Sequence, residues 1–163
     1  MKREATTDKG GVTLSTGHPQ LLAEIRAEIA ATGPIPFARF MDLALYHPKY
    51  GYYVRPVDDP TQERIGWSGD FYTSSDVHPI LGQALARQAQ QLDTLLGHPD
   101  PFTVLEMGAG KGLLARDFLT ACRNAPANLR DRLRYILIER SAAMRTQQQH
   151  TLAPWVGQAG RVA

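Results

Sequence analysis

The sequence contains a single cysteine, Cys122, among its 163 residues. One cysteine excludes a disulfide framework within the chain and any metal site built from several thiolates, and it suits a reducing compartment. Long apolar runs are also lacking, because proline, glycine or a charged residue interrupts each one well short of a membrane span. The five histidines show no spacing typical of metal ligands. We therefore expect neither a membrane-spanning segment nor a metal site.

The chain has no excess of either charge. It carries 18 basic and 16 acidic side chains, a net charge of +2, and no basic stripe interleaved with aromatic residues. Hydrophobic residues make up 43% of the sequence and charged residues 21%. This composition can bury a core, and it is too balanced for a disordered chain or a nucleic-acid-binding arm. We expect one folded domain, or part of one, with no nucleic-acid partner.

The first 98 residues predict an arm followed by helices. Residues 1–17 are polar, show neither a secretory signal nor a transit peptide, and predict a flexible arm. Residues 18–98 predict a helical extension, with a long loop and one short strand between residues 49 and 67. Apolar residues at helical spacing indicate a first helix with Leu22, Ile25 and Ile29, and a second, beginning at Pro36, with Phe37, Phe40, Met41 and Ala44.

A longer helix is predicted from near Asp76 to Gly97, with Pro79 in its first turn. Its periodicity is the strongest in the chain. Five apolar residues at helical spacing are expected to form its buried face: Leu81, Leu85, Ala89, Leu92 and Leu96.

Residues 99–163 alternate strand and helix patterns. A β-prone run, Phe102–Glu106, precedes a glycine-rich turn and a helix with apolar residues at helical spacing, namely Leu114, Phe118 and Cys122. A second apolar run, Tyr135–Glu139, leads through Ser141 into another helix. This order predicts the first two strand–helix units of an α/β, Rossmann-like fold with a parallel sheet. Two parallel strands leave edges and faces of the sheet uncovered. We therefore expect this chain to be the N-terminal portion of a larger domain, or to be completed by a partner chain. A homodimer is a further hypothesis.

The sharpest local signal is the segment Glu106-Met107-Gly108-Ala109-Gly110-Lys111-Gly112, between a predicted strand and a predicted helix. Its glycines allow a sharp turn and leave space for a ligand beside the helix N-terminus. A phosphate-binding P-loop needs Ser or Thr where this chain has Gly112, and a dinucleotide fingerprint needs glycine where it has Leu113. The remaining pattern is typical of class I methyltransferases that bind S-adenosylmethionine. The alternative is a plain tight turn whose glycines serve only helix–strand packing.

A second acidic residue, Glu139, ends the next predicted strand. Its carboxylate is expected at the same sheet edge as the glycine turn, where it could accept hydrogen bonds from both ribose hydroxyls of an adenosyl ligand. NAD-dependent enzymes use a carboxylate in the same way. An NAD-dependent enzyme is therefore a less favoured alternative.

Four segments, in this order, carry a resemblance to a known family. They are Ala44-Leu45-Tyr46-His47-Pro48 with Tyr50-Gly51-Tyr52-Tyr53, then Gly69-Asp70-Phe71-Tyr72-Thr73-Ser74, then the glycine motif, then Ile138-Glu139-Arg140-Ser141 with Arg145 and Gln148. From about Pro34 to Gln149 the chain resembles the MidA-like S-adenosylmethionine-dependent methyltransferases, which are related to the mitochondrial complex I assembly methyltransferase. It departs from the usual pattern at two turn positions, where Ser75 and Ala142 replace a frequent proline.

The resemblance implies a class I methyltransferase fold, of which this chain holds the N-terminal portion, and S-adenosyl-L-methionine as the cofactor. It also implies methylation of a protein side chain, with arginine as the favoured acceptor, and a link to a respiratory complex I subunit. The implied location is the bacterial cytoplasm or, in a eukaryote, the mitochondrial matrix. The alternative is an assembly or binding protein that keeps the cofactor site and performs no chemistry.

The resemblance also implies roles for twelve residues. Gly108, Gly110 and Gly112 would shape the turn, Ala109 and Lys111 would offer backbone amides, Glu106 would hold the ligand's ammonium group and Glu139 its ribose. A loop over the cofactor would contain Gly69, Asp70, Phe71, Thr73 and Ser74, with Asp70 the preferred polar contact. From the residues alone, that loop is equally well interpreted as a turn with a helix N-cap. A helix cap is the less favoured alternative for Glu106, and the Lys111 side chain is expected to be solvated. No residue is assigned as a catalytic base.

Overall fold

The computed structural model describes residues 17–55, 64–123, 125 and 127–156, side chains 127 and 128 excepted, and the backbone of residues 6–7 and 13–14. The chain divides into two compact units, Met1–Pro56 and Val57–Ala163, each with its own buried core. This division differs from the predicted boundary between residues 98 and 99, because the long helix before that boundary packs against the helix after the glycine turn. Within the predicted arm, β1 (Thr6–Thr7) pairs antiparallel with β2 (Thr13–Leu14); most of the arm lies outside the described residues.

The first unit is built on two helices, α1 (Pro19–Thr32) and α2 (Phe37–Tyr46). Three buried residues form its core: Leu21, Ile25 and Leu43. Of the three apolar residues whose spacing predicted α1, Ile25 is buried, whereas Leu22 and Ile29 are exposed. The apolar stripe predicted for α2 is likewise largely uncovered, with the Phe37 side chain 73% exposed.

An aromatic cluster packs the segment after α2 onto the first unit. The ring of Tyr50 stacks on that of His18, with centroids 4.3 Å apart, and on that of His47, with centroids 5.2 Å apart. Nε2 of His47 lies 2.9 Å from a carboxylate oxygen of Glu24. The middle of the predicted long loop, residues 56–63, lies outside the described residues.

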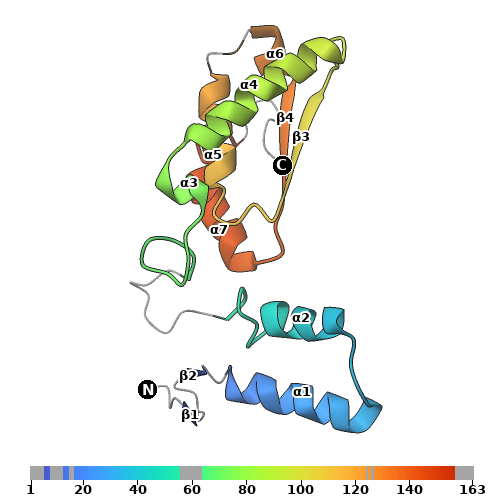
Figure 1. The fold of residues 1–163 in the computed structure, drawn as a ribbon. Coiled ribbons are helices and arrows are strands. Elements are labelled where there is room, and N and C mark those ends of the chain that lie inside the picture. Colours follow the sequence, from blue (N-terminus) through green and yellow to red (C-terminus); the bar gives the residue numbers. More distant parts are fainter. Residues whose placement is uncertain are drawn as a thin grey trace. The chain divides into compact units, whose positions relative to one another are not determined.

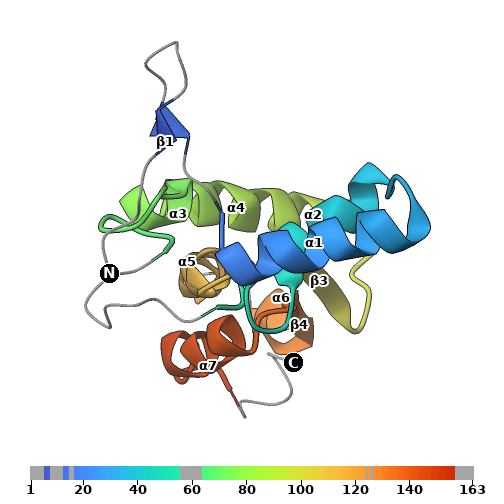
Figure 2. The same cartoon turned by 90° about the horizontal axis from the view of Figure 1, so that it is seen from below.

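The second unit contains a parallel pair of strands, β3 (Phe102–Met107) and β4 (Leu133–Ile138), as the sequence predicts. Three helices lie on one side of the strands (Figure 1, Figure 2): α4 (Ile80–Leu95), α5 (Leu113–Cys122) and α7 (Ala142–Thr151). The core between them holds residues of both strands and of α5, including Phe102, Tyr135, Phe118 and Cys122. A short helix that the sequence did not predict, α6 (Ala127–Arg132), precedes β4.

The long predicted helix is two helices. The first, α3 (Ser74–Val77), ends at His78, whose backbone is extended, and α4 begins after Pro79. The break follows from the proline, since its ring disfavours a helical conformation in the residue before it.

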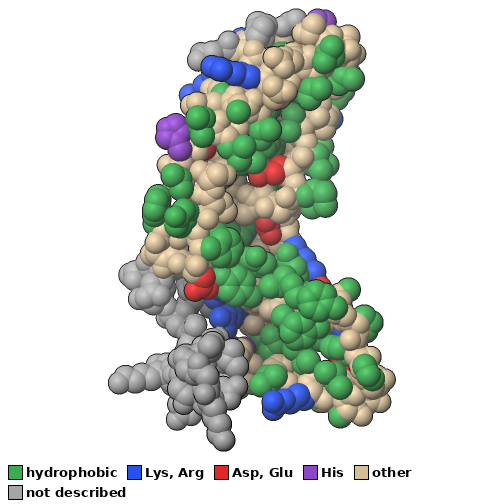
Figure 3. Space-filling model, viewed as in Figure 1, with side chains coloured by type: hydrophobic (Ala, Val, Ile, Leu, Met, Phe, Trp, Pro, Cys, Tyr) green, Lys and Arg blue, Asp and Glu red, His purple; other side chains and the backbone are tan. Residues whose placement is uncertain are grey.

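Of the five residues predicted for the buried face of α4, Ala89 is buried, and the prediction is wrong for the four leucines. Most of its leucines are exposed, and its buried residues are Gly82, Ala86, Ala89 and Asp93. The reason is the close approach of α5: a Cβ added to Gly82 would lie 2.6 Å from Cβ of Asp117. Small residues therefore form the contact, and hydrophobic side chains gather on the outside of α4 and along β3 (Figure 3).

One face of the two-stranded sheet is open within the described residues. Leu105, Met107 and Ile138 alternate with inward-facing residues and are 52%, 76% and 48% exposed. This agrees with the expectation that two strands alone leave apolar surface uncovered. No helix in the described part of the chain is long and apolar enough to cross a membrane.

An ion pair fixes the end of the sheet far from the glycine turn. The guanidinium of Arg132 donates to both carboxylate oxygens of Asp93, at 2.8 and 3.0 Å, and also to the backbone oxygen of Pro99. Nδ1 of His98 lies 2.7 Å from the same carboxylate. These hydrogen bonds, led by that from Arg132, lower the pKa of Asp93. The C-terminal end of α4 is thereby joined to the residues that precede β3 and β4.

Candidate functional site

The glycine turn connects β3 to α5. All three glycines of the turn have positive φ angles: 68° at Gly108, 53° at Gly110 and 77° at Gly112. Residues with a Cβ rarely adopt such angles. The amide of Gly108 donates to the backbone oxygen of Ile138 at 2.7 Å, so pairing with the second strand continues into the turn. A Cβ placed on Gly108 or Gly110 would meet nothing within 4 Å. The turn therefore has open space on the side of these two glycines, as a bound ligand requires.

Gly112 differs from the other two glycines. It is buried and is the left-handed N-cap of α5. A Cβ there would lie 3.3 Å from side-chain atoms of Gln148 and Leu152, both in or next to α7. Helix packing thus accounts for this glycine, in the way the alternative interpretation of the motif expected.

The carboxylate of Glu139 lies against the turn, which confirms its predicted place at this sheet edge. One oxygen accepts from the Gly110 amide at 2.9 Å and the other from the Ser141 amide at 2.7 Å. From α7, the side-chain amide of Gln148 donates to the Gly110 oxygen at 2.8 Å. The backbone of Gly110 is therefore held on both sides, and the half-buried carboxylate is fixed beside the open space.

Glu106, the last residue but one of β3, is half-buried. The Tyr135 hydroxyl on β4 donates to its carboxylate at 2.7 Å, whereas the sequence offered a helix cap as the alternative role. Burial raises the pKa of Glu106, and the hydrogen bond from Tyr135 opposes only part of that shift. Tyr135 was missed as a partner, although it carries a hydroxyl group and directly precedes the aliphatic run Ile136-Leu137-Ile138 of the same strand.

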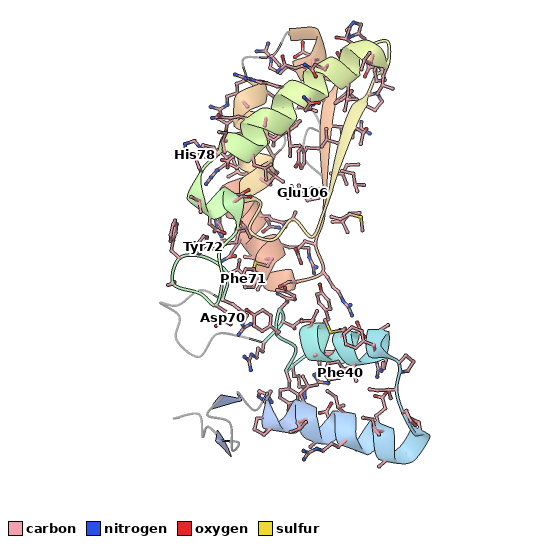
Figure 4. All side chains as sticks on the ribbon, in the orientation of Figure 1. Phe40, Asp70, Phe71, Tyr72, His78 and Glu106 are labelled. Atoms are coloured by element: carbon pink, nitrogen blue, oxygen red, sulfur yellow. The ribbon has the colours of Figure 1, made fainter. Side chains whose placement is uncertain are left out.

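A compact loop precedes α3 and carries the other predicted residues, among them Asp70 and Phe71 (Figure 4). Ile65 and Phe71 form an isolated β-bridge, and the Gly66 amide donates to the Phe71 oxygen at 2.8 Å. The rings of Trp67 and Tyr72 stack with centroids 4.8 Å apart and remain largely exposed. Asp70 and Phe71 are exposed as well.

The loop ends in a capping box. Thr73 is the N-cap of α3, and the carboxylate of Asp76 accepts from its amide and its hydroxyl, both at 2.8 Å. This bears out the interpretation of Thr73 and Ser74 as a turn and N-cap. The spacing of Thr73 and Asp76, three residues apart, was the available signal.

The side chain of Lys111 is not solvated, contrary to the interpretation from sequence. Its Nζ donates to a carboxylate oxygen of Asp76 at 2.7 Å and to the backbone oxygen of Ile65 at 3.0 Å. Burial alone would raise the pKa of Asp76, but the hydrogen bonds from Lys111 and Thr73 outweigh it and hold the pKa below its usual value. The loop with Gly69 to Ser74 is thus connected to the glycine turn through a residue that the sequence did not implicate, Asp76.

The structure therefore brings the glycine turn, Glu106 and Glu139 together in the second unit, whereas Asp70 and Phe71 lie exposed on the loop that Lys111 holds. Glu106, on β3, and Glu139, the residue after β4, lie next to the turn, and the loop is connected to it through the Lys111–Asp76 ion pair. Among the described residues, no group of three or more His, Cys, Asp or Glu could hold a metal ion. Cys122 is buried, and burial raises its pKa to about 11, as expected of a core residue.

Comparisons with known proteins point in one direction. Residues 84–162 match the family model described as "Putative S-adenosyl-L-methionine-dependent methyltransferase". A Drosophila melanogaster protein named protein arginine methyltransferase NDUFAF7 homolog, mitochondrial, is 38% identical over 104 residues, 64% of this chain and 22% of its own length. The Homo sapiens protein arginine methyltransferase NDUFAF7, mitochondrial, is 32% identical over 61% of this chain and 21% of its own length.

A solved structure is similar to nearly the whole chain. It is a crystal structure from Burkholderia thailandensis bound to S-adenosyl-homocysteine, with a TM-score of 0.69 and 32% identity over 93% of this chain and 40% of that one. The chain thus spans about a fifth of the length of the curated relatives and two-fifths of the solved neighbour.

Proposed function

Because this chain belongs to the MidA-like family of S-adenosylmethionine-dependent methyltransferases, we propose that its second unit binds S-adenosyl-L-methionine as part of a protein methyltransferase. The observation that carries the proposal is the open space over Gly108 and Gly110, with the carboxylate of Glu139 fixed beside it. A glycine turn that served packing alone would not need that space. The neighbour bound to S-adenosyl-homocysteine supports the same ligand class.

The residues fit the parts of this cofactor. Each carboxylate oxygen of Glu139 accepts one backbone hydrogen bond and keeps capacity for a ribose hydroxyl. Within the described part of the chain, only Tyr135 donates to Glu106, so a second oxygen can accept from the ligand's ammonium group. A carboxylate in a half-buried place binds a cation more strongly than an exposed one, since less water screens the charges.

The cofactor supplies a methyl group on a sulfonium, which an acceptor nitrogen attacks in line. The S–C bond breaks as the N–C bond forms, S-adenosyl-homocysteine leaves, and the nitrogen loses a proton. What the chain contributes is orientation and exclusion of water, in which the glycine turn and the loop before α3 take part. We assign no base to accept the proton.

The acceptor is proposed to be an arginine side chain of a protein. Relatives named protein arginine methyltransferases support this choice. The complex I subunit implied by the family resemblance remains a proposal, and so does the location, either the mitochondrial matrix or the bacterial cytoplasm. A protein that binds the cofactor without transferring its methyl group is the competing proposal.

Isothermal titration with S-adenosylmethionine tests the cofactor, with NADH as the competing ligand. We expect saturable binding of the sulfonium ligand alone. Glu139→Ala should weaken it roughly tenfold or more, since a charge-assisted hydrogen bond is lost. Asp131→Ala, which removes an exposed carboxylate on α6, is the matched control and should leave binding unchanged. Binding of NADH in place of S-adenosylmethionine would overturn the proposal.

Transfer is tested with the full-length protein and a methyl-labelled cofactor. Incorporation of label into arginine of a partner protein, abolished by S-adenosyl-homocysteine, is the expected result. Cofactor binding without incorporation into any mitochondrial or bacterial protein fraction would favour the binding protein over the enzyme.

A further inference from the structure

We infer that Lys111 is a positioning residue, which latches the segment Arg64–Asp76 onto the glycine turn and thereby slows release of the bound cofactor. The identity of that ligand rests on the proposed function. The latch itself rests on contacts between described residues of the second unit.

The latch holds the segment near both of its ends. Nζ of Lys111 donates to the backbone oxygen of Ile65 at one end and to the carboxylate of Asp76 at the other. The same carboxylate accepts from Thr73, and the Trp67 ring nitrogen donates to the Asp76 backbone oxygen at 3.2 Å. One cationic group therefore contacts the segment near its start and at its end.

The ion pair is shielded from water. The side chains of Lys111 and Asp76 are 17% and 4% exposed, so salt screens their attraction less than that of a surface pair. Removing one partner leaves the other poorly solvated and uncompensated, which makes the loss larger than at the surface. The pair thus favours the position of the segment in which Asp76 lies against Lys111.

Lys111 lies between Gly110, which belongs to the open part of the turn, and Gly112, which belongs to the packed part. Its backbone belongs to the candidate ligand site, and its side chain belongs to the contact with the segment. Movement of the segment away from the turn requires this side chain to give up the backbone oxygen of Ile65 and the carboxylate of Asp76. A ligand seated on the turn lies next to the residue that holds the segment, so we expect movement of the segment to change how fast the ligand leaves.

Hydrogen exchange tests the latch without any ligand. The amides of Gly66, Asp70 and Thr73 donate hydrogen bonds within the segment, and exchange reports how often such bonds open. Lys111→Met should speed their exchange roughly tenfold, Asp76→Asn should do the same, and Lys111→Arg should restore most of the protection. The control is Arg130→Met, which removes a cation from an exposed ion pair on α6. Unchanged protection in both Lys111→Met and Asp76→Asn would overturn the latch.

Release of S-adenosyl-homocysteine tests the consequence. Labelled S-adenosyl-homocysteine is bound to each variant and displaced with excess S-adenosylmethionine. Lys111→Met and Asp76→Asn should each release the label about tenfold faster than wild type. The double variant should release it no faster than either single variant, because the two residues act through one contact. Loss of folded protein would lower the bound fraction and leave the rate alone, which separates a structural defect from an open latch. Equal rates of S-adenosyl-homocysteine release from the variants and from wild type would overturn the inference. If wild type does not bind this ligand at all, the proposed function is overturned instead, and the hydrogen-exchange result still decides whether the latch exists.

Discussion

The side-chain amide of Gln148, on α7, donates a hydrogen bond of 2.8 Å to the main-chain oxygen of Gly110. The Gly110 amide donates in turn to Glu139, the residue after β4. The turn after the first strand is therefore held by the second strand–helix unit. Neither of these two strand–helix units, β3 with α5 or β4 with α7, can form the candidate site alone.

Gln148→Ala should lower the free energy of unfolding by about 1–3 kcal/mol, because the Gly110 oxygen loses its partner and Gln148 is 8% exposed. Urea denaturation followed by circular dichroism measures it. Gln147→Ala changes the exposed neighbour on the same helix and should fall within about 0.5 kcal/mol of wild type. Equal effects of the two substitutions would contradict the assigned contact.

Substitutions at two glycines should separate binding from folding. Gly110→Ala meets open space, so beyond a backbone strain of about 1–2 kcal/mol it should chiefly weaken S-adenosylmethionine binding. Gly112→Ala adds contact with Gln148 and Leu152 to a similar strain and should chiefly destabilise the fold. Calorimetric titration and thermal unfolding of both variants, side by side, distinguish the two effects. The reverse pattern would mean that the ligand does not lie over Gly110.

Gly82→Ala should destabilise the second unit by about 1–3 kcal/mol, although alanine normally favours a helix. The new methyl group would lie 2.8 Å from the Phe118 backbone nitrogen on α5, so the two helices would have to separate. Leu85→Ala, at an exposed position one turn along α4, is the comparison. Chemical denaturation of both variants gives the values, and a neutral Gly82→Ala would show that α4 and α5 are less closely packed.

The strand–turn–helix order could be predicted from the sequence, because the glycine spacing and the apolar runs are local signals. The place of Glu139 followed from a general property of parallel sheets, whose strand ends meet at one edge. The buried face of α4 could not be predicted in this way. Hydrophobic periodicity selects its leucines, whereas the contact with α5 requires residues as small as Gly82.

Glu106→Gln should stabilise the fold relative to wild type at neutral pH more than at pH 4. The pKa of Glu106 is raised by burial, so its ionised form disfavours folding; this penalty is absent below its unfolded pKa of about 4.3 and grows as the pH rises toward the folded value. Unfolding measured at pH 4 and pH 7 gives the difference. Binding of S-adenosylmethionine should meanwhile weaken roughly tenfold, because the ammonium group loses a charged partner. A larger stabilisation at pH 4 would contradict the sign.

Cys122 should resist thiol reagents in the native protein. Its side chain is 2% exposed and burial raises its pKa to about 11, so little thiolate exists at pH 8. Reaction with a disulfide reagent should be complete in denaturant and slow without it. Rapid reaction of one thiol per chain in the absence of denaturant would show that α5 is loosely packed.

The pair of Lys111 and Asp76 explains why part of the site could not be read from the sequence. The two residues are 35 positions apart, and each has a common local interpretation, a solvated lysine and a helix-capping carboxylate. Their contact depends on how the segment before α3 folds back. Helix α6 was missed for a similar reason, since its single buried leucine, Leu129, gives no periodicity.

The ion pair of Arg132 and Asp93 has a consequence at the opposite end of the strands. It fixes the residues just before β3 and β4, and the register pairs Phe102 with Leu133 and Met107 with Ile138. A slip of one residue would set Ile138 or Arg140 beside the glycine turn, replacing a carboxylate by an alkyl chain or by a guanidinium. The alignment chosen at the distant end of the sheet therefore decides the charge that a ligand meets at the turn.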